Sequence, residues 1–444
     1  MQRAVVLGGS YAGLFAARVL SDHADEVVVI EADGHVDGGT GRGAPQRQQL
    51  HALLGMGHTQ LEAQFPGITR ELVDAGALLG SRSAVQFYVD GVQKARVPGD
   101  QNQMIGATRP FIEEHVRRRV LGIPNIRIQA GQAQDLIIRG SRVVGVQYSA
   151  DEAAGPASGT GAELEADLVV DAMGRSSRLG TWLQNQGWDA APMERMRIDV
   201  GYATATFKRG RELPDTVIAH ATPGPASGYQ PTLCEPGAIA AVEGSRWAVA
   251  ISGYAGHRPG RDPDQFRDRM LRCVAPLQEI AEHCEMDSEV MPYTFRESQR
   301  REFKRLTRFP GGLVAVGDSV ASVNPIYGQG LTLAAVQAAS LSAHLRSGVS
   351  VHAPAWGYFR RIGGVVDAAW SLSTSADLAQ PHVNGPYPRG YRFTRWAGDK
   401  ITQASVIDPI VNSAFMDVLH MRAHPKSLTR PRVLLRTARV LATS

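Results

Sequence analysis

A glycine-rich turn near the start of the chain carries the first recognisable chemistry. Residues 8–13 read Gly-Gly-Ser-Tyr-Ala-Gly, between an apolar run at 3–7 and a helical pattern at 14–20, and Glu31 ends the next apolar run. Glycines allow a tight turn and close helix packing, the helix N-terminus attracts a pyrophosphate, and an acidic side chain accepts ribose hydroxyls. The pattern predicts a dinucleotide site. Because Glu31 would repel a 2′-phosphate, FAD or NAD fits better than NADP.

A second group of such residues lies far downstream. Gly317-Asp318 follows another apolar run, and residues 324–330 read Asn-Pro-Ile-Tyr-Gly-Gln-Gly just before a helical pattern. An enzyme that binds only NAD has no need for this second group. With these residues most of the chain resembles the FAD-dependent monooxygenases, a family that includes aromatic hydroxylases and squalene epoxidase. The resemblance implies FAD as cofactor, with O2 and NAD(P)H as co-substrates.

The same resemblance assigns roles to individual residues. It implies that Asp318 holds the ribityl chain, and that the helix starting near Gly330 points its positive end at the flavin and stabilises negative charge there. Arg109, at the head of a predicted helix, resembles the family arginine that reaches the phosphates. Residues 167–178 resemble a further FAD segment of the family, but Met173 stands where many hydroxylases have aspartate. This difference argues for a separate flavin reductase rather than direct use of NADPH.

These segments together predict the surroundings of the cofactor. We expect the flavin ring environment to be shaped by Pro325, Gly328, Gln329 and Gly330. The remaining expected FAD contacts are Gly8, Ser10, Tyr11, Ala12, Gly13, Glu31, Ala32, Arg42, Gln46, Arg109, Ala133, Asp171, Gly174, Gly317, Asp318, Leu331 and Thr332. No protein residue is assigned as catalytic, because the flavin supplies the oxidant. No metal is expected, and packing or solvated roles are predicted for His51 and His58, which have no carboxylate or cysteine at ligand spacing.

Subfamily features suggest the substrate class. Pro45-Gln46 with His51, and the segment Glu243-Gly-Ser-Arg-Trp247, resemble bacterial flavin epoxidases of polyether-type polyketide biosynthesis. The resemblance implies transfer of one oxygen atom from O2, through a flavin C4a-hydroperoxide, to a lipophilic substrate, most directly epoxidation of a polyene or terpenoid alkene in bacterial secondary metabolism. Aromatic side chains alternate along the middle strands, so about half should face an ordinary core and half the substrate. The candidates are Tyr202, Phe207, Trp247, Tyr254 and Phe295.

Other functions stay open on the same architecture. One is hydroxylation of an aromatic ring or indole, and another is reduction of prenyl double bonds, as in geranylgeranyl reductases, which needs no O2. A third is a non-catalytic lipid-binding escort without flavin, of the GDP-dissociation-inhibitor kind. A halogenase is less favoured, because the sequence contains no Trp-x-Trp-x-Ile-Pro segment.

Composition indicates a cytoplasmic protein. The 444 residues include three cysteines at spacings typical of neither a zinc site nor a redox pair, and the N-terminus lacks a signal-peptide pattern. No apolar run of about 18 residues predicts a spanning helix.

The last 24 residues hold six basic side chains and no carboxylate side chain, too sparse a charge for nucleic acid. A helix predicted at 431–441 could lie on anionic lipid, although packing on its own protein is the more common arrangement, and membrane association is the less favoured prediction.

The elements that must position these residues point to an α/β fold. Apolar runs at 3–7, 26–30, 167–171 and 313–316 predict buried strands, and helices are expected at 48–64, 110–121 and 330–345. Longer runs at 201–208, 238–242 and 247–254 predict an antiparallel sheet. We therefore predict a Rossmann-like FAD-binding domain interrupted by an antiparallel-sheet substrate domain, plus C-terminal helices. The expected divisions are FAD-binding parts at 1–80, 101–178 and 299–345, substrate-domain parts at 81–100 and 179–298, and a helical region at 346–444.

Overall fold

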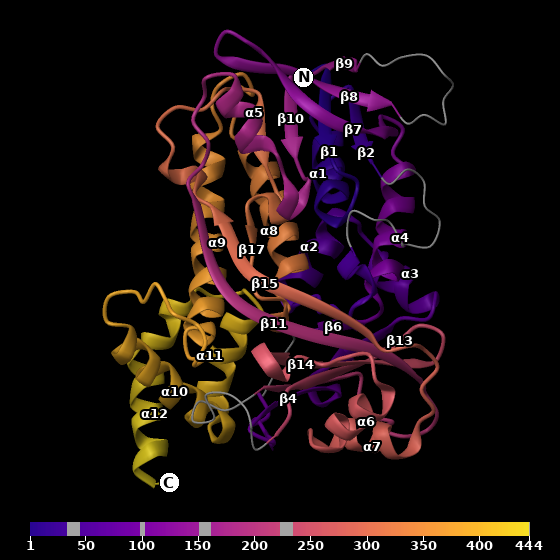
Figure 1. The fold of residues 1–444 in the computed structure, drawn as a ribbon, viewed down its shortest axis with the longest axis vertical. Coiled ribbons are helices and arrows are strands. Elements are labelled where there is room, and N and C mark those ends of the chain that lie inside the picture. The colour runs from indigo at the N-terminus through magenta and orange to yellow at the C-terminus, as the bar shows by residue number, and fades with distance from the viewer. Residues whose placement is uncertain (33–44, 98–102, 151–160, 223–233, 444) are drawn as a thin grey trace.

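The computed structural model describes residues 1–32, 45–97, 103–150, 161–222 and 234–443. Figure 1 shows two sheets one above the other along the long axis of the molecule, with the long strands β11 and β15 crossing between the upper and lower halves. The C-terminal helices lie beside the lower sheet. The predicted class, an α/β fold with an added sheet and C-terminal helices, is confirmed.

The upper sheet has seven strands in the order β16-β10-β1-β2-β7-β8-β9. From β16 to β7 all neighbours are parallel, and β8 and β9 add an antiparallel edge. The central strands are apolar except for charged residues at their ends, and they are almost fully buried, as expected when helices cover both faces. The strands are β1 (Arg3–Leu7), β2 (Glu26–Glu31), β7 (Ile126–Arg139), β8 (Arg142–Ala150), β9 (Ala162–Glu165), β10 (Leu168–Asp171) and β16 (Leu313–Ala315).

Helices of the upper half pack around this sheet in one continuous apolar core. They are α1 (Tyr11–Ser21), α2 (Gly55–Gln64), α3 (Ile68–Asp74), α4 (Arg109–Leu121), α5 (Leu179–Asn185), α8 (Gly330–Leu345) and α9 (Trp356–Asp377). The short 3-10 helices near the strand ends are η1 (Pro45–Gln48), η4 (Gly174–Ser176), η8 (Gly317–Ser319) and η9 (Pro325–Tyr327). Thr108 accepts a hydrogen bond from the Phe111 amide and so caps α4 at the predicted position.

The helix expected at 48–64 is wrong in its first third, since α2 begins only at Gly55. The Gln49 side chain accepts from the Thr204 hydroxyl at 2.9 Å, and the same hydroxyl accepts from the Leu50 amide at 3.1 Å. Thr204 lies on the lower sheet. The segment is held extended because it bridges the two halves of the molecule.

The lower sheet has eight strands in the order β17-β15-β11-β14-β13-β12-β4-β5, antiparallel except for the pair β12 and β4. Helices α6 (Pro263–Leu271) and α7 (Ala275–His283) cover one face. The strands are β4 (Val85–Val89), β5 (Val92–Gln93), β11 (Met193–Lys208), β12 (Ile218–Thr222), β13 (Gly237–Val242), β14 (Arg246–Tyr254), β15 (Met291–Arg301) and β17 (Ala321–Ser322). β3 (Leu78–Ser81) and β6 (Gln103–Gly106) form a separate pair.

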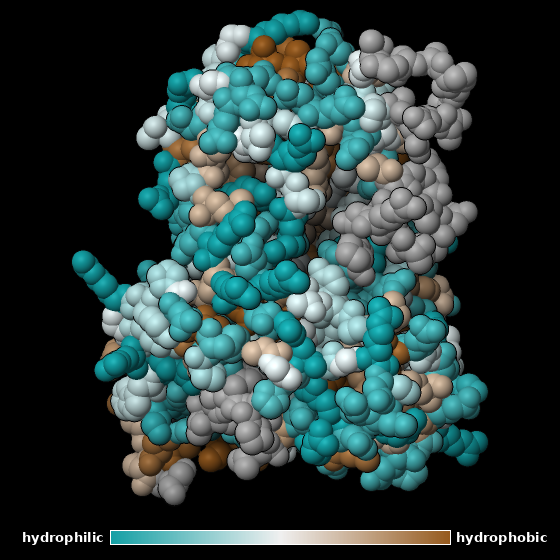
Figure 2. Space-filling model, viewed as in Figure 1, coloured by the Kyte–Doolittle hydropathy of each residue, from teal (hydrophilic) through white to brown (hydrophobic). Residues whose placement is uncertain are grey.

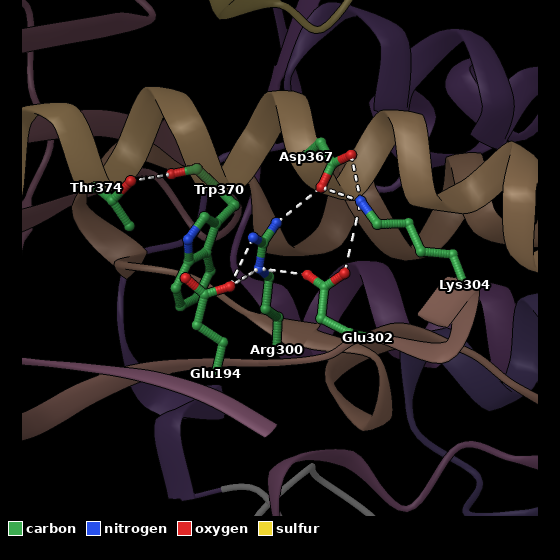
Figure 3. A network of polar contacts seen from close by, with 7 residues as sticks. All are labelled: Glu194, Arg300, Glu302, Lys304, Asp367, Trp370 and Thr374. Atoms are coloured by element: carbon green, nitrogen blue, oxygen red, sulfur yellow. Dashed lines mark hydrogen bonds and ion pairs between the residues drawn. The ribbon is translucent and has the colours of Figure 1, made fainter. Parts of the chain in front are cut away.

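An ion-pair network ties α9 to the lower sheet (Figure 3). The Arg300 guanidinium, on β15, contacts Glu194 of β11 at 2.6 Å and Asp367 of α9 at 2.8 Å. Lys304 reaches the same Asp367 carboxylate, and Trp370 lies under the guanidinium with 4.9 Å to the ring centroid. Because Arg300 is 14% exposed, the contacts with Glu194 and Asp367 are better shielded than a surface pair. The network fixes the start of the C-terminal region.

The C-terminal region continues, after a proline-rich loop, as α10 (Tyr391–Ile407), α11 (Pro409–Leu419) and α12 (Pro431–Thr443). These helices share a small core of Ile401, Ala404, Val411 and Val433. The helix predicted at 431–441 is therefore confirmed, and one side of it packs on its own protein.

Candidate functional site

The predicted turns meet at the carboxyl ends of neighbouring parallel strands. β10, β1 and β2 end at Asp171, Leu7 and Glu31, and the turns at 8–13 and 317–318 follow β1 and β16. This edge is where open α/β sheets bind ligands. The turns are so close that a Cβ on Gly317 would lie 2.6 Å from the Cβ of Ala12.

Two glycines of the first turn are required by their surroundings. Gly8 has φ +104°, and a Cβ there would lie 2.7 Å from the Ala172 carbonyl oxygen. A Cβ on Gly13 would lie 1.8 Å from the Gly8 carbonyl oxygen. The turn can form only with glycine at both positions.

The acidic end of β2 is held beside this turn. Glu31 is buried and accepts a hydrogen bond from the Gly9 amide. Ala32 is exposed, and Ala133 is half-buried on β7, three residues beyond the Ala130 that pairs with Glu31. Ser10 precedes α1 without capping it by its side chain. The expected adenosine end is thus assembled from β1, β2 and β7.

A buried charge network stands in front of α1. Glu113 accepts from Arg109 at 2.8 Å and pairs with Arg47 at 2.9 Å, and it also accepts from the Tyr11 amide at 3.3 Å. Burial alone would raise the pKa of Glu113, but Arg109 and Arg47 outweigh it and the pKa is lowered. Arg117 donates to the Gly9 carbonyl at 2.8 Å. Two guanidiniums against one carboxylate leave this end of the site positively charged, as a phosphate requires.

Two further groups orient Arg109. His51 lies 3.1 Å from the Arg109 guanidinium, and burial together with Arg109 lowers its pKa to about 3, so the imidazole is neutral. Glu243, from the turn before β14, accepts from both the amide and the hydroxyl of Thr108, directly before Arg109. The sequence predicts a packing or solvated role for His51, and in the structure its imidazole makes a polar contact with Arg109.

The turn after β10 is held from within. Asp171 is fully buried and accepts from the Met173 amide at 3.0 Å and the Ser319 hydroxyl at 3.0 Å. Burial raises its pKa. Ser319 accepts from the Gly174 amide at 2.9 Å, and Arg301 donates to the Ser319 carbonyl at 2.8 Å. Asp171 therefore positions the backbone, and its carboxylate is occupied by protein donors.

Asp318 lies where the upper and lower sheets meet. Its carboxylate accepts from Ser322 at 3.1 Å. Burial raises the pKa of Asp318, opposed by Ser322 and by Arg109, Arg175 and Arg301. Among the described residues Ser322 is the one side chain that donates a hydrogen bond to this carboxylate, so the carboxylate can still accept from the hydroxyls of a sugar chain.

The turn at 324–330 ends in an open helix N-terminus. Asn324 accepts from the Ile326 amide at 3.1 Å, and Gly328 has φ +65° with Ala52 packed against it. Gly330 is exposed with no atom within 4 Å of where its Cβ would be. No side chain caps α8, and its first turn holds no acidic residue. The positive potential of its first amides is therefore offset by neither a capping side chain nor an acidic residue of that turn.

Three other predicted contacts surround this helix start. Pro325 is half-buried, Leu331 is buried, and Thr332 is fully buried with its hydroxyl accepting from the Leu54 amide at 3.0 Å. Gln329 is also buried, and its Oε1 has no hydrogen-bond partner within the described part of the chain. An orphaned acceptor at this place fits a donor from a bound ligand.

A residue of α9 supports the same turn from behind. Asp377 is fully buried and accepts from Asn324 at 2.6 Å and from the Tyr254 hydroxyl at 2.9 Å. Burial, opposed by these hydrogen bonds, raises the pKa of Asp377 to about 7. Tyr254, a predicted substrate contact, is therefore a support of the 324–330 turn.

Because side chains alternate along a strand, the aromatic residues predicted to contact the substrate lie on opposite faces of the lower sheet. Phe207 and Trp247 are fully buried in the core beneath α6 and α7, so they do not face the upper half. Tyr202 points the other way, 5.5 Å from the Tyr293 ring and within electrostatic reach of Asp318 and Arg109. Phe207 and Trp247 belong to the core side of the sheet, which contradicts the expectation that they contact the substrate, and Tyr202 stays a predicted substrate contact.

Other aromatic groups face the turn at 324–330. Phe295 lies under the Arg175 guanidinium at 4.5 Å, and both line a pocket of about 500 Å³. On β4 and β12, Phe87 and His220 are paired side by side, and the His220 imidazole hydrogen-bonds the backbone of Ile326. Phe87 and His220 could be found only once the register of the two strands is known.

The remaining predictions concern single residues and absences. Arg42 lies outside the described residues, and Gln46 is half-buried in η1. Within the described ranges no cluster of three or more His, Cys, Asp or Glu side chains could hold a metal ion. No helix among them is long and apolar enough to cross a bilayer.

The expected cofactor, FAD, fits this edge of the molecule. Bound FAD would meet Glu31 with its adenosine end, the Arg47–Glu113–Arg109 network with its phosphates and Asp318 with its ribityl chain. The orphaned Gln329 oxygen and the uncapped α8 mark the flavin end.

Comparisons with known proteins identify the family and the fold of the chain. The tryptophan halogenase family profile matches residues 128–369. Protein Rv3254 of Mycobacterium tuberculosis is 30% identical over 432 residues, covering 93% of this chain and 88% of that protein.

Solved structures share the fold at low identity. The flavin-dependent brominase Bmp2 has a TM-score of 0.68 at 14% identity, covering 99% of this chain and 98% of Bmp2. p-Nitrophenol 4-monooxygenase PnpA of Pseudomonas putida DLL-E4 has a TM-score of 0.65 at 16% identity, covering 95% and 100%. PqsL, a probable FAD-dependent monooxygenase of Pseudomonas aeruginosa, also has 0.65 at 16% identity, covering 90% and 99%. The family match spans more than half of the sequence, and the chain belongs to the tryptophan halogenase family.

Proposed function

We propose that the protein is an FAD-dependent monooxygenase that adds one oxygen atom from O2 to a lipophilic organic substrate, most directly by epoxidation of an alkene. One observation carries the proposal: the turns after β1, β10 and β16 and the uncapped N-terminus of α8 meet at one sheet edge. Bound FAD would activate O2 and supply the oxygen atom.

The chain's own groups have separate tasks in this proposal. Arg47 and Arg109 hold the phosphates, and Asp318 accepts from the ribityl hydroxyls. The start of α8 stabilises negative charge on the reduced ring system. The face of the lower sheet that carries Tyr202 and Phe87 excludes water and holds the substrate. An alkene needs no protein nucleophile, which agrees with the absence of a nucleophile–base pair among these groups.

The lipophilic substrate is supported by the surface that faces the 324–330 turn. Leu54, Met104 and Ile218 form an apolar cluster there, with Phe87 and Met421 partly exposed beside it. We propose that electrons come from a separate reductase. Met173, half-buried against the upper core, offers no charge at the position where many related hydroxylases have aspartate.

The test uses heavy oxygen. The purified protein, an added NAD(P)H:flavin reductase and a linear polyene alcohol are incubated under 18O2, and products are identified by mass spectrometry. The proposal expects one 18O atom in an epoxide. A product formed without O2 and carrying two added hydrogens would identify a prenyl reductase instead, and oxygen on an aromatic test substrate alone would identify a hydroxylase.

Halogenation is a second candidate, favoured by the match to the tryptophan halogenase family. The absence of a Trp-x-Trp-x-Ile-Pro segment weighs against it. Repeating the incubation with bromide and an indole or phenol separates the two, because a brominated product has a characteristic isotope pattern. Bromination without epoxidation would replace the first proposal.

A further inference from the structure

Exposed apolar side chains gather on the C-terminal helices. Six of the thirteen large apolar side chains exposed in the described residues lie between 387 and 435. Five of the six that are more than half exposed are among them. In Figure 2 apolar residues are visible at the lower left, next to the C-terminal end of the chain. The six are Tyr387, Phe393, Trp396, Ile407, Leu434 and Leu435.

α12 has two apolar sides, of which only one is covered. Val433 is buried and Val440 partly buried against α10 and α11. Leu434 and Leu435, turned away by the helical advance, are 42% and 72% exposed. Arg432 and Arg439 are exposed on the same helix. A helix that exposes both leucines and arginines in this way resembles the amphipathic helices that lie in the plane of a membrane, at the level of the lipid headgroups.

The basic charge of the chain is concentrated in the same region. Residues 386–444 contain ten Lys or Arg and three Asp, a formal charge of +7. The whole chain carries +4, so residues 1–385 carry −3. Within the region Asp399 and Asp408 form ion pairs with Arg395 and Arg436. The region attracts an anionic surface.

We propose that α10 and α12 dock the protein on an anionic lipid surface. Leu434 and Leu435 enter the acyl boundary, and the Phe393 and Trp396 rings, 5.8 Å apart on α10, lie at headgroup level. The charge argues against a second copy of the chain as the occupant, because a two-fold interface would bring +7 against +7. Anionic headgroups neutralise that charge instead.

The experiment is sedimentation of the full-length protein with vesicles. One set contains phosphatidylcholine alone, and the other an equal mixture of phosphatidylcholine and phosphatidylglycerol. We expect binding to the anionic set only, weakened by added salt. Leu434→Ser/Leu435→Ser should abolish it. Arg430→Gln/Arg432→Gln should weaken it about 25-fold, about fivefold for each arginine.

Matched controls lie away from α10 and α12, one on α3 and one between α8 and α9. Val349 is 48% exposed and Arg70 is 89% exposed by its side chain, so Val349→Ser and Arg70→Gln should bind as the natural protein does. The proposal is overturned by a protein that binds neither vesicle set, binds both sets equally, or keeps full binding in the α12 variants. It is also overturned if the natural protein sediments as a dimer that Leu434→Ser/Leu435→Ser dissociates while vesicle binding is absent.

Discussion

Asp377 offers a direct test of how the 324–330 turn is held. Its buried carboxyl group joins α9 to Asn324, the first residue of that turn, and to Tyr254 of the lower sheet. Asparagine at this position keeps the shape and an acceptor oxygen but carries no titrating proton. Asp377→Asn therefore isolates the effect of the charge.

The direction in which pH changes the stability follows from the raised pKa of Asp377. Burial raises the pKa of Asp377 from 3.8 to about 7, so the folded protein holds this proton more tightly than the unfolded chain does. Stability is highest below the unfolded value and falls as pH rises, until it levels off above the folded value. Between about pH 5 and about pH 8 the charge on Asp377 costs about 2 to 3 kcal/mol of unfolding free energy.

The assay compares two proteins at two pH values. Urea unfolding is followed by tryptophan fluorescence for the natural protein and for Asp377→Asn, at pH 5 and at pH 8. All other groups titrate alike in both proteins, so the change in their difference reports Asp377. We expect the variant to gain about 2 to 3 kcal/mol relative to the natural protein between the two pH values. A difference that is the same at both would refute the reasoning.

Further predictions concern the cofactor edge and the lower sheet. Gly13→Ala places a methyl group 1.8 Å from the Gly8 oxygen, so the purified variant should lose the flavin absorbance band. Arg109→Met leaves a buried carboxylate partly unpaired, and should lower stability by about 3 to 5 kcal/mol and raise the Kd for FAD at least tenfold, measured by titration. Phe207→Ala should cost about 3 to 5 kcal/mol of stability with kcat/KM nearly unchanged, whereas Tyr202→Ala should lower kcat/KM and cost less stability. Equal effects of Phe207→Ala and Tyr202→Ala on kcat/KM would contradict the assignment of faces.

Local backbone requirements made much of the site predictable from sequence. The turn at 8–13 must be built with glycines in particular positions, and the turn at 324–330 needs Gly328 at positive φ. Such needs leave a fixed spacing in the sequence. The strand–turn–helix unit at the N-terminus and the helix at 330–345 were predictable for the same reason.

Contacts between distant segments leave no such spacing. Glu113 and Arg47 meet in front of α1, Glu243 holds the start of α4, and Asp377 supports Asn324 from another region of the chain. From the sequence alone, each of these charged side chains is indistinguishable from one that is exposed to solvent. Alternation along β11 predicted two faces, but only the position of α6 and α7 shows which face is core.

An equilibrium titration of flavin-free protein with FAD tests whether the carboxyl edge of the upper sheet is an FAD site. The bound fraction is followed by the flavin absorbance and fluorescence, with Gly13→Ala beside the natural protein. We expect saturable binding of one FAD per chain, and we expect Gly13→Ala to abolish this binding while the far-UV spectrum stays native. No saturable binding by the natural protein, or equal binding by the variant, would contradict it.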